Sequence, residues 1–228
     1  LRSSDILKAF NNSVVITLVG VGMSMVATIL AAYPLSKSYF YARRFFTKAL
    51  VFTMIFSGGL IPGYLLIKSL GLINSYGSLW LPGLVSTYNM LILRTNFEGV
   101  SKELDDAARI DGCGDFRLLL QIYLPLSKAV LATLTLFYAV GYWNMFMSLL
   151  LYINDAKKYN LSVLVQNMIN SQSALQQLSS MDLKDTVSLT PEGLKAAGIV
   201  IMVLPMMAVY PFIQKYFVKG VMLGAVKG

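Results

Sequence analysis

Long apolar stretches without a single charged residue dominate this chain and restrict how it can fold. A helix needs about 20 apolar residues to cross a bilayer core of ~30 Å. Five stretches reach or approach that length: 9–36, 49–67, 69–93, 129–154 and 196–214. Only 13% of the 228 residues are charged and 56% are hydrophobic, whereas a soluble domain carries about 25% charged residues. The sequence therefore predicts an integral membrane protein.

The apolar stretches are continuous rather than alternating, so we expect helices and not strands. We place the helices near residues 12–34, 46–68, 78–98, 127–152 and 194–218. The expected fold class is all-α, a polytopic membrane helix bundle with about five spans and short helices between two of them. Residues 1–228 are expected to form a single transmembrane domain.

The distribution of basic residues predicts the orientation of this bundle. Segment 37–48 carries four Lys and Arg and no acid. With five spans, it shares one side with segment 101–126 and the C-terminal tail, and that side holds twelve of the 19 basic residues. The positive-inside rule makes this side cytoplasmic. Segment 153–193 then becomes an extracytoplasmic loop, and the apolar spacing from Leu161 to Ile169 predicts a short amphipathic helix within it.

The composition also excludes several classes of function. The chain has no His and one Cys, Cys113, so zinc sites, Ser-His-Asp chemistry and an internal disulfide are not expected. We predict no catalytic residue and no metal ligand. The net charge of +8 is dispersed among apolar stretches, which argues against nucleic acid as a partner. The chain contains no Walker A sequence, so we expect it to bind no nucleotide.

The most informative polar segment is 101–126, which lies between two of the expected spans. Ser101 can cap a helix whose first turn carries acidic residues such as Glu103, and the helix dipole favours acids there. Gly112 permits a sharp bend, and a second short helix then carries Leu119. The sequence predicts two short helices at an angle, with small residues between them.

The spacing within this segment matches a known pattern, which consists of Asp106, Ala107, Ala108, Gly112, Ile122, Leu124 and Pro125. It resembles the cytoplasmic coupling motif of permease subunits of bacterial ABC importers, in which Glu usually stands at the position of Asp106. The resemblance implies that the segment docks a cytoplasmic ATPase through Glu103, Asp106, Ala107, Ala108, Gly112 and Leu119. The alternative is an ordinary amphipathic loop between two spans.

Further residues extend the resemblance along the chain: Asn12-Ser13, Ala31-Ala32-Tyr33, the stretch 56–62 (FSGGLIP) and the stretch 141–144 (GYWN). They resemble the carbohydrate-uptake branch of ABC importers, which includes maltose and multiple-sugar transporters. Such a subunit pairs with a homologous second permease, two ATPases that bind ATP and Mg, and an extracytoplasmic solute-binding protein. It lies in the bacterial cytoplasmic membrane and has six helices, so we expect one more helix upstream of Leu1.

Polar and aromatic residues within or near the spans are candidates for the substrate pathway, because intramembrane polar side chains usually face a cavity or a bundle interior. The candidates are Gly58, Gly59, Tyr88, Asn89, Trp143 and Asn144. Aromatic rings can stack on sugar rings, and Asn can hydrogen-bond to hydroxyl groups. The alternative is structural: glycines permit helix packing, and Trp and Tyr form belts at the membrane interface.

Two other functions compete with an ATP-driven importer. The first is a secondary transporter or channel driven by an ion gradient, which typically carries ionisable residues in mid-span. The five charge-free stretches argue against it. The second is a membrane-embedded enzyme, which the absence of His and of paired mid-membrane carboxylates disfavours.

Overall fold

The computed structural model describes residues 3–179 and, beyond them, residues 193, 196, 198, 200, 203–205 and 207; for residues 3, 4 and 172–179 only the backbone is described. No strand occurs among these residues, which confirms the all-α prediction for the described part. The helices are α1 (Ser3–Ser36), α2 (Arg43–Ile55), α3 (Leu60–Ser69), α4 (Gly77–Trp80), α5 (Thr87–Glu98), α6 (Lys102–Ile110), α7 (Asp115–Leu118), η1 (Leu119–Tyr123, a π-helix), α8 (Leu124–Leu126), α9 (Lys128–Trp143), α10 (Met147–Tyr152), η2 (Ala156–Lys158, a 3₁₀ helix) and α11 (Leu161–Ser179).

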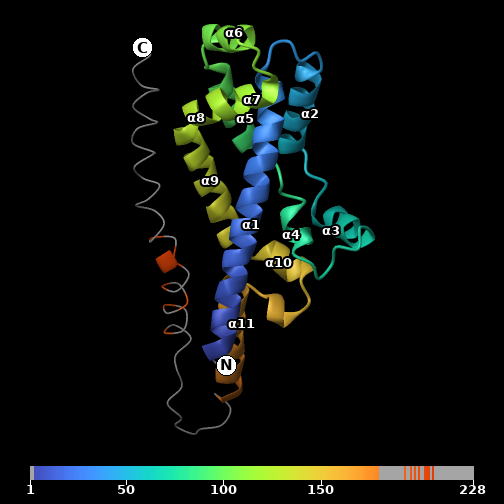
Figure 1. Cartoon of the computed structure of the whole chain (residues 1–228). Coiled ribbons are helices and arrows are strands. Elements are labelled where there is room, and N and C mark those ends of the chain that lie inside the picture. The colour runs from blue at the N-terminus through green and yellow to red at the C-terminus, as the bar shows by residue number, and fades with distance from the viewer. Residues whose placement is uncertain are drawn as a thin grey trace.

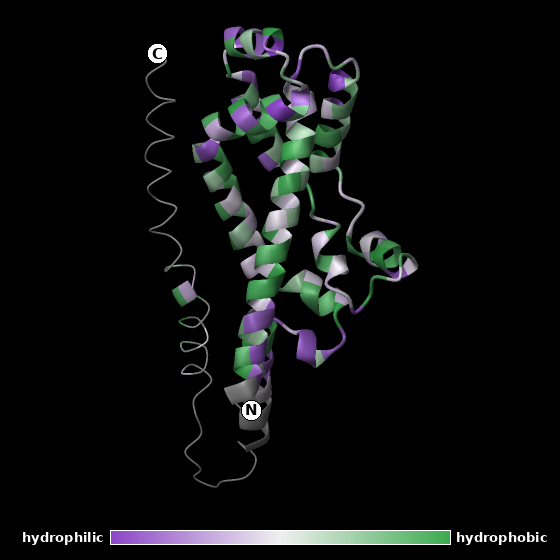
Figure 2. Ribbon diagram, in the orientation of Figure 1, coloured by the Kyte–Doolittle hydropathy of each residue, from purple (hydrophilic) through white to green (hydrophobic). Residues whose placement is uncertain are grey.

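Helix α1 is the central element, and α5 and α9 pack along it. It runs through most of the molecule in Figure 1, with α6 at one end and α11 at the other. We refer to these as the α6 end and the α11 end. Figure 2 shows apolar residues along the middle of α1 and α9 and more hydrophilic residues towards both ends. This pattern is typical of helices that cross a bilayer.

The second expected helix, 46–68, is not continuous. Helices α2 and α3 meet at an angle of 117°, and residues 56–59 between them are not helical. Phe56 has extended backbone, and Gly59 has a φ of 82°, which is a conformation that glycine adopts readily and other residues adopt at a cost. The prediction treated the two glycines as packing or pathway residues and overlooked their effect on the backbone.

The third and fourth expected helices are also interrupted. Residues 81–86, which include Pro82 and Gly83, separate α4 from α5, because proline removes a backbone donor and glycine weakens helices. Residues 144–146 separate α9 from α10. This break exposes the carbonyl of Met145, which accepts a hydrogen bond of 2.7 Å from the Asn160 side chain. The fifth expected helix, 194–218, falls largely outside the described residues.

The breaks bear on the number of spans. Residues Asp5–Ser36 of α1 form one helix that is long and apolar enough to cross a membrane. The described chain has up to three such spans if each of two bent pairs is counted as one: α2 with α3, and Asp115–Leu126 with α9, which are bent by 84°. The predicted total of five spans remains a prediction.

Three apolar cores lie along α1 within the described residues, and the smallest packs Ala9 against Leu161 and Val165 of α11. The core towards the α6 end joins the end of α1 to α5, α9 and residues 108–123. Three rings lie at its centre, with centroids 5.3 Å apart for Tyr33 and Tyr123, 5.5 Å for Phe97 and Tyr123, and 6.2 Å for Tyr33 and Phe97. All three pairs are edge-to-face, and each such pair contributes about 0.5–1.5 kcal/mol beyond area burial. The second core joins Ile16 of α1 to α4, α9, α10 and α11.

Candidate functional site

Residues 101–126 fold into a compact helical knob at the α6 end, and we use this name for them below (Figure 1). The Ser101 hydroxyl accepts a hydrogen bond of 3.2 Å from the Glu103 backbone N–H, which confirms the predicted N-cap. Gly112 ends the turn after α6 with a φ of 77°. The Cys113 N–H then closes the turn by donating to the Ala108 carbonyl at 2.9 Å. Two short helices at an angle result, as the sequence predicts.

The knob exposes some of the predicted docking residues and buries others. Glu103, Asp106 and Ala107 are exposed, whereas Ala108 and Leu119 are only 8% and 3% exposed and pack into the core below the knob. Large apolar side chains that the sequence analysis did not assign to docking are exposed instead: Leu104, Ile110, Phe116 and Leu120. With Ala107 they give the knob exposed apolar groups among charged residues such as Glu103 and Asp106.

A buried lysine ties the knob to α1. Lys37 directly follows α1 and is 5% exposed. Its ammonium lies 2.8 Å from Asp105 Oδ2 in α6, donates to the Tyr123 hydroxyl at 2.7 Å and lies 4.0 Å from the centre of the Tyr123 ring. Removing one partner of such a buried pair leaves an uncompensated charge and costs about 3–5 kcal/mol. Sequence analysis used Lys37 only as a sign of orientation.

A second polar contact braces the two halves of the knob. Arg109 of α6 donates to Asp115 Oδ1 of α7 at 2.6 Å and to the Tyr39 hydroxyl at 2.9 Å. Tyr39 in turn donates to Asp115 at 2.8 Å. Partial burial raises the pKa of Asp115, but the hydrogen bonds from Tyr39 and Arg109 outweigh it and the net pKa is lowered. Burial, followed by the hydrogen bond to Asp115, raises the pKa of Tyr39.

A cavity of about 750 Å³ lies between α9 and the start of α5. Tyr88 and Asn89, both predicted pathway residues, line it together with Tyr138 and Tyr142. The hydroxyls of Tyr138 and Tyr142 are 2.6 Å from Thr28 Oγ1 and 2.9 Å from Ser24 Oγ of α1, respectively. These bonds fix both rings at the cavity wall. Among the described residues, the lining has aromatic rings, hydroxyls and an amide, and no charged side chain.

The other four pathway candidates do not line this cavity. Gly58 and Gly59 lie at the break between α2 and α3, where an added Cβ would meet nothing within 4 Å. Trp143 is buried, and its ring packs edge-on against Phe10 at 6.1 Å between centroids. Asn144 is exposed at the end of α9. The structure therefore brings together two of the six candidates.

The described part of the predicted outer loop is docked on α1 at the α11 end. The Asn160 side chain accepts from the Val163 N–H at 2.9 Å and caps α11, while Ser13 of α1 accepts from the Leu161 N–H at 2.9 Å. The amide of Asn12 donates to the Lys157 carbonyl at 2.9 Å. Sequence analysis noted Asn12 and Ser13 only as part of a resemblance. The predicted amphipathic helix is present as α11, and its later residues run beyond the predicted stretch.

Comparison with known proteins defines the class to which this chain belongs. A family model described as "Binding-protein-dependent transport system inner membrane component" matches residues 24–223. The chain belongs to this family of transport-system membrane components, and it is therefore an integral membrane protein.

Named relatives narrow the class further. Protein LplC of Bacillus subtilis (strain 168) is 43% identical over 225 residues, which cover 97% of this chain and 75% of LplC. YtcP of the same organism, a polygalacturonan/rhamnogalacturonan transport system permease protein, is 42% identical over 228 residues, with 99% and 79% covered. A solved bacterial ABC transporter involved in import of the acidic polysaccharide alginate superposes with a TM-score of 0.84 and 30% identity, covering 95% of this chain and 76% of that one. The resemblance to permeases of ABC importers is confirmed.

Proposed function

We propose that this chain is the permease subunit of an ATP-driven, binding-protein-dependent importer of a sugar or oligosaccharide in the bacterial cytoplasmic membrane. The observation that carries the proposal is the similarity over nearly the whole chain to permeases whose names specify polysaccharide-derived substrates. None of the matches reported above is to an ion-gradient-driven transporter.

The cavity beside Tyr88 and Asn89 suits a sugar in size and chemistry. At about 750 Å³ it falls in the range of small-molecule sites, which combine apolar walls with a few polar groups. Tyr88, which is 56% exposed, offers a ring for stacking at this cavity, while Asn89, Tyr138 and Tyr142 are buried in its wall. We assign this cavity to the substrate pathway. A homologous second permease would complete the pathway on its open side.

The knob is the part of the chain that we assign to the ATPase. Its exposed apolar side chains Leu104, Ile110, Phe116 and Leu120, together with the small exposed residue Ala107, suit a cleft in a partner. The ATPases would bind ATP and Mg and perform the hydrolysis, while this chain contributes no catalytic group. In this assignment the α6 end is cytoplasmic and the α11 end faces the solute-binding protein.

The contacts below the knob provide a mechanical route to the cavity. Movement of α6 acts on Lys37 through Asp105, and Lys37 is joined directly to α1. Helix α1 in turn holds Tyr138 and Tyr142 at the cavity wall through Thr28 and Ser24. The ATPases would contact the knob differently with and without ATP, so ATP binding would stabilise one position of the knob over another. The cavity would then open to the opposite side of the membrane.

Reconstitution tests the proposal. Proteoliposomes with this chain, its partner permease, the ATPases and the solute-binding protein should take up labelled oligosaccharide only with internal ATP and external binding protein. Collapse of ion gradients by ionophores should leave the initial rate unchanged. Uptake that persists without ATP and stops with ionophores would instead establish an ion-coupled transporter.

A further inference from the structure

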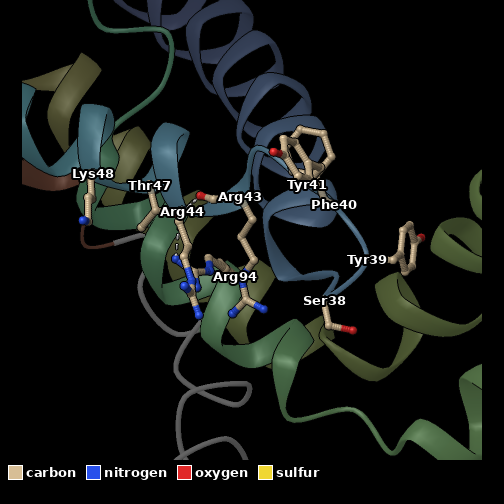
Figure 3. Close-up of a pocket in the computed structure, with 9 residues that line it drawn as sticks. All are labelled: Ser38, Tyr39, Phe40, Tyr41, Arg43, Arg44, Thr47, Lys48 and Arg94. Carbon is tan, nitrogen blue, oxygen red and sulfur yellow. Dashed lines mark hydrogen bonds between the residues drawn. The ribbon is translucent and has the colours of Figure 1, made fainter.

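A basic cavity of about 810 Å³ lies at the α6 end, between the start of α2 and the later turns of α5 (Figure 3). It is separate from the cavity assigned to substrate. Residues 38–41 form one wall. The helices contribute Arg43, Arg44, Thr47, Lys48 and Arg94. Figure 3 shows the three guanidinium groups directed to the same region, with Lys48 to one side.

The cationic charge of this cavity is only partly balanced by the protein. The Glu98 carboxylate pairs with both Arg43 and Arg94, the latter at 2.9 Å. Within the described ranges, Arg44 and Lys48 form no ion pair. Glu98 therefore balances part of the charge of Arg43 and Arg94, while Arg44 and Lys48 lie beside them without a carboxylate partner among the described residues, and an anion placed between these cations would reduce their repulsion. Guanidinium groups bind phosphate oxygens through two parallel hydrogen bonds. We propose that this cavity binds the phosphate headgroup of an anionic phospholipid.

The face of α2 below the cavity indicates a lipid rather than a soluble phosphate. Arg44 and Lys48 are four residues apart, and Phe52 and Ile55 continue the same helical face. Phe52 and Ile55 are 58% and 72% exposed, and no charged residue follows Lys48 until Lys68. A headgroup bound by Arg44 and Lys48 would place its acyl chains along these two apolar side chains. A soluble phosphate would gain nothing from them.

Aromatic residues place the cavity at the depth of the headgroups. Tyr41, which lines the cavity, is fully exposed, and Phe45, next to Arg44 in the sequence, is 71% exposed. Exposed aromatic side chains gather at the boundary between hydrocarbon and water. Groups of Lys and Arg at this boundary attract anionic lipids, and basic pockets between helices bind their headgroups.

Lipid retention by the purified complex tests this site. The complex is extracted from membranes containing equal amounts of phosphatidylglycerol and phosphatidylcholine, and the retained lipids are quantified by mass spectrometry. The double variant Arg44→Gln/Lys48→Gln should bind phosphatidylglycerol roughly 30-fold more weakly. The matched control Lys8→Gln/Lys68→Gln removes two exposed charges at the other end and should retain it fully. High salt should weaken retention in the unaltered complex.

Three results would overturn the proposal. Equal phosphatidylglycerol retention by both double variants would show that Arg44 and Lys48 bind no headgroup. Loss of the ATPase subunits from Arg44→Gln/Lys48→Gln, with lipid retention unchanged, would assign the cavity to a protein contact. Saturable binding of inorganic phosphate to the complex in phosphatidylcholine alone, abolished in that variant, would assign it to a soluble phosphate.

Discussion

Lys37 is the residue that joins the knob most directly to α1. Its charge is buried where α1 ends, and its two polar partners both belong to the knob: Asp105 at 2.8 Å and the Tyr123 hydroxyl at 2.7 Å. A buried lysine needs such partners because an unpaired charge in the interior is costly. The same contacts that satisfy the charge also join the proposed ATPase-docking segment to α1, the helix that holds Tyr138 and Tyr142 in the wall of the proposed pathway.

Replacing Lys37 by Met should uncouple the knob from α1. The change leaves Asp105 with only its longer ion pair to Arg109 at 3.4 Å, so the loss of stability should lie below the about 3–5 kcal/mol of a fully unpaired buried charge. We expect transport and sugar-stimulated ATP hydrolysis to fall sharply. Adding Asp105→Asn to Lys37→Met removes the carboxylate that has lost its closest cation and should recover part of the stability, which thermal unfolding of the complex would measure. Lys128→Met, at an exposed helix start, is the control. Unchanged transport and sugar-stimulated ATP hydrolysis in Lys37→Met would show that Lys37 does not transmit movement from the knob to α1.

The lowered pKa of Asp115 predicts that the stability of the knob depends on pH. Its pKa is lowered in the folded chain despite partial burial, because Tyr39 and Arg109 donate hydrogen bonds to it. The stabilisation is therefore present at neutral pH and is lost as the pH falls through the lowered pKa. Asp115→Asn should cost up to about 1 kcal/mol at pH 7, and the difference from the unaltered chain should vanish in acid. A difference that grows towards acid would contradict this sign.

At the scale of elements, the helices and turn of the polar segments could be predicted from the sequence, whereas the breaks inside the apolar stretches were overlooked. The helix of the knob with its Ser101 cap, the turn at Gly112 and the helix in the outer loop were all predicted, because each rests on residues a few positions apart. The breaks at 56–59, 81–86 and 144–146 were missed. Hydropathy reports burial in lipid and is insensitive to backbone direction, so these apolar stretches were interpreted as continuous helices.

Part of the candidate site could also be predicted from the sequence, and part of it could not. The motif located the knob, but it could not separate exposed Ala107 from buried Ala108 and Leu119, since exposure depends on the core beneath. The pairing of Lys37 with Asp105 joins residues 68 positions apart, and no spacing rule detects such a contact. Tyr138 and Tyr142 were likewise missed as a pair, because their common cavity depends on how α9 packs on α1.

The two alanines of α6 should behave differently. Ala107→Trp adds bulk to the outer surface of the knob and should abolish sugar-stimulated ATP hydrolysis without altering the stability of this chain. Ala107→Ser adds one atom and should be nearly silent. Ala108→Trp would enter the core and should destabilise the chain by overpacking, by about 1–3 kcal/mol or more. Thermal unfolding and ATPase assays on the same samples separate the effects. Equal loss of stability for both Trp variants would contradict the placement of α6.

Asn160 should control the anchoring of α11. Loss of its cap typically costs about 1 kcal/mol, and Asn160→Ala also removes the bond to the Met145 carbonyl at 2.7 Å. We expect faster hydrogen exchange in α11 and weaker stimulation of ATP hydrolysis by sugar-loaded binding protein. Asn167→Ala changes an exposed residue of the same helix and is the control. Similar exchange in the two variants would show that Asn160 does not hold the segment.

In the whole molecule, the segments proposed for ATPase docking, for substrate and for the solute-binding protein lie at different positions along α1. The knob lies at one end and the docked outer segment at the other (Figure 1), and the cavity with Tyr88 and Asn89 lies at α5 and α9, which pack along α1. Hydrogen bonds from α1 reach each part: Lys37 to the knob, Ser24 and Thr28 to the cavity wall, and Asn12 to the outer segment. A long helix such as α1, with polar contacts to all three parts, is suited to transmit movement between the ATPase and a substrate site.

The central claim is that the knob docks the ATPase, and site-specific cross-linking tests it most directly. A photoreactive amino acid in place of Ile110, which is 87% exposed, should capture the ATPase subunit in intact complexes, with a yield that changes when ATP is added. The same group in place of Tyr88, 56% exposed at the cavity, should capture no ATPase. Absence of an ATPase adduct from position 110 in an active complex would contradict the account.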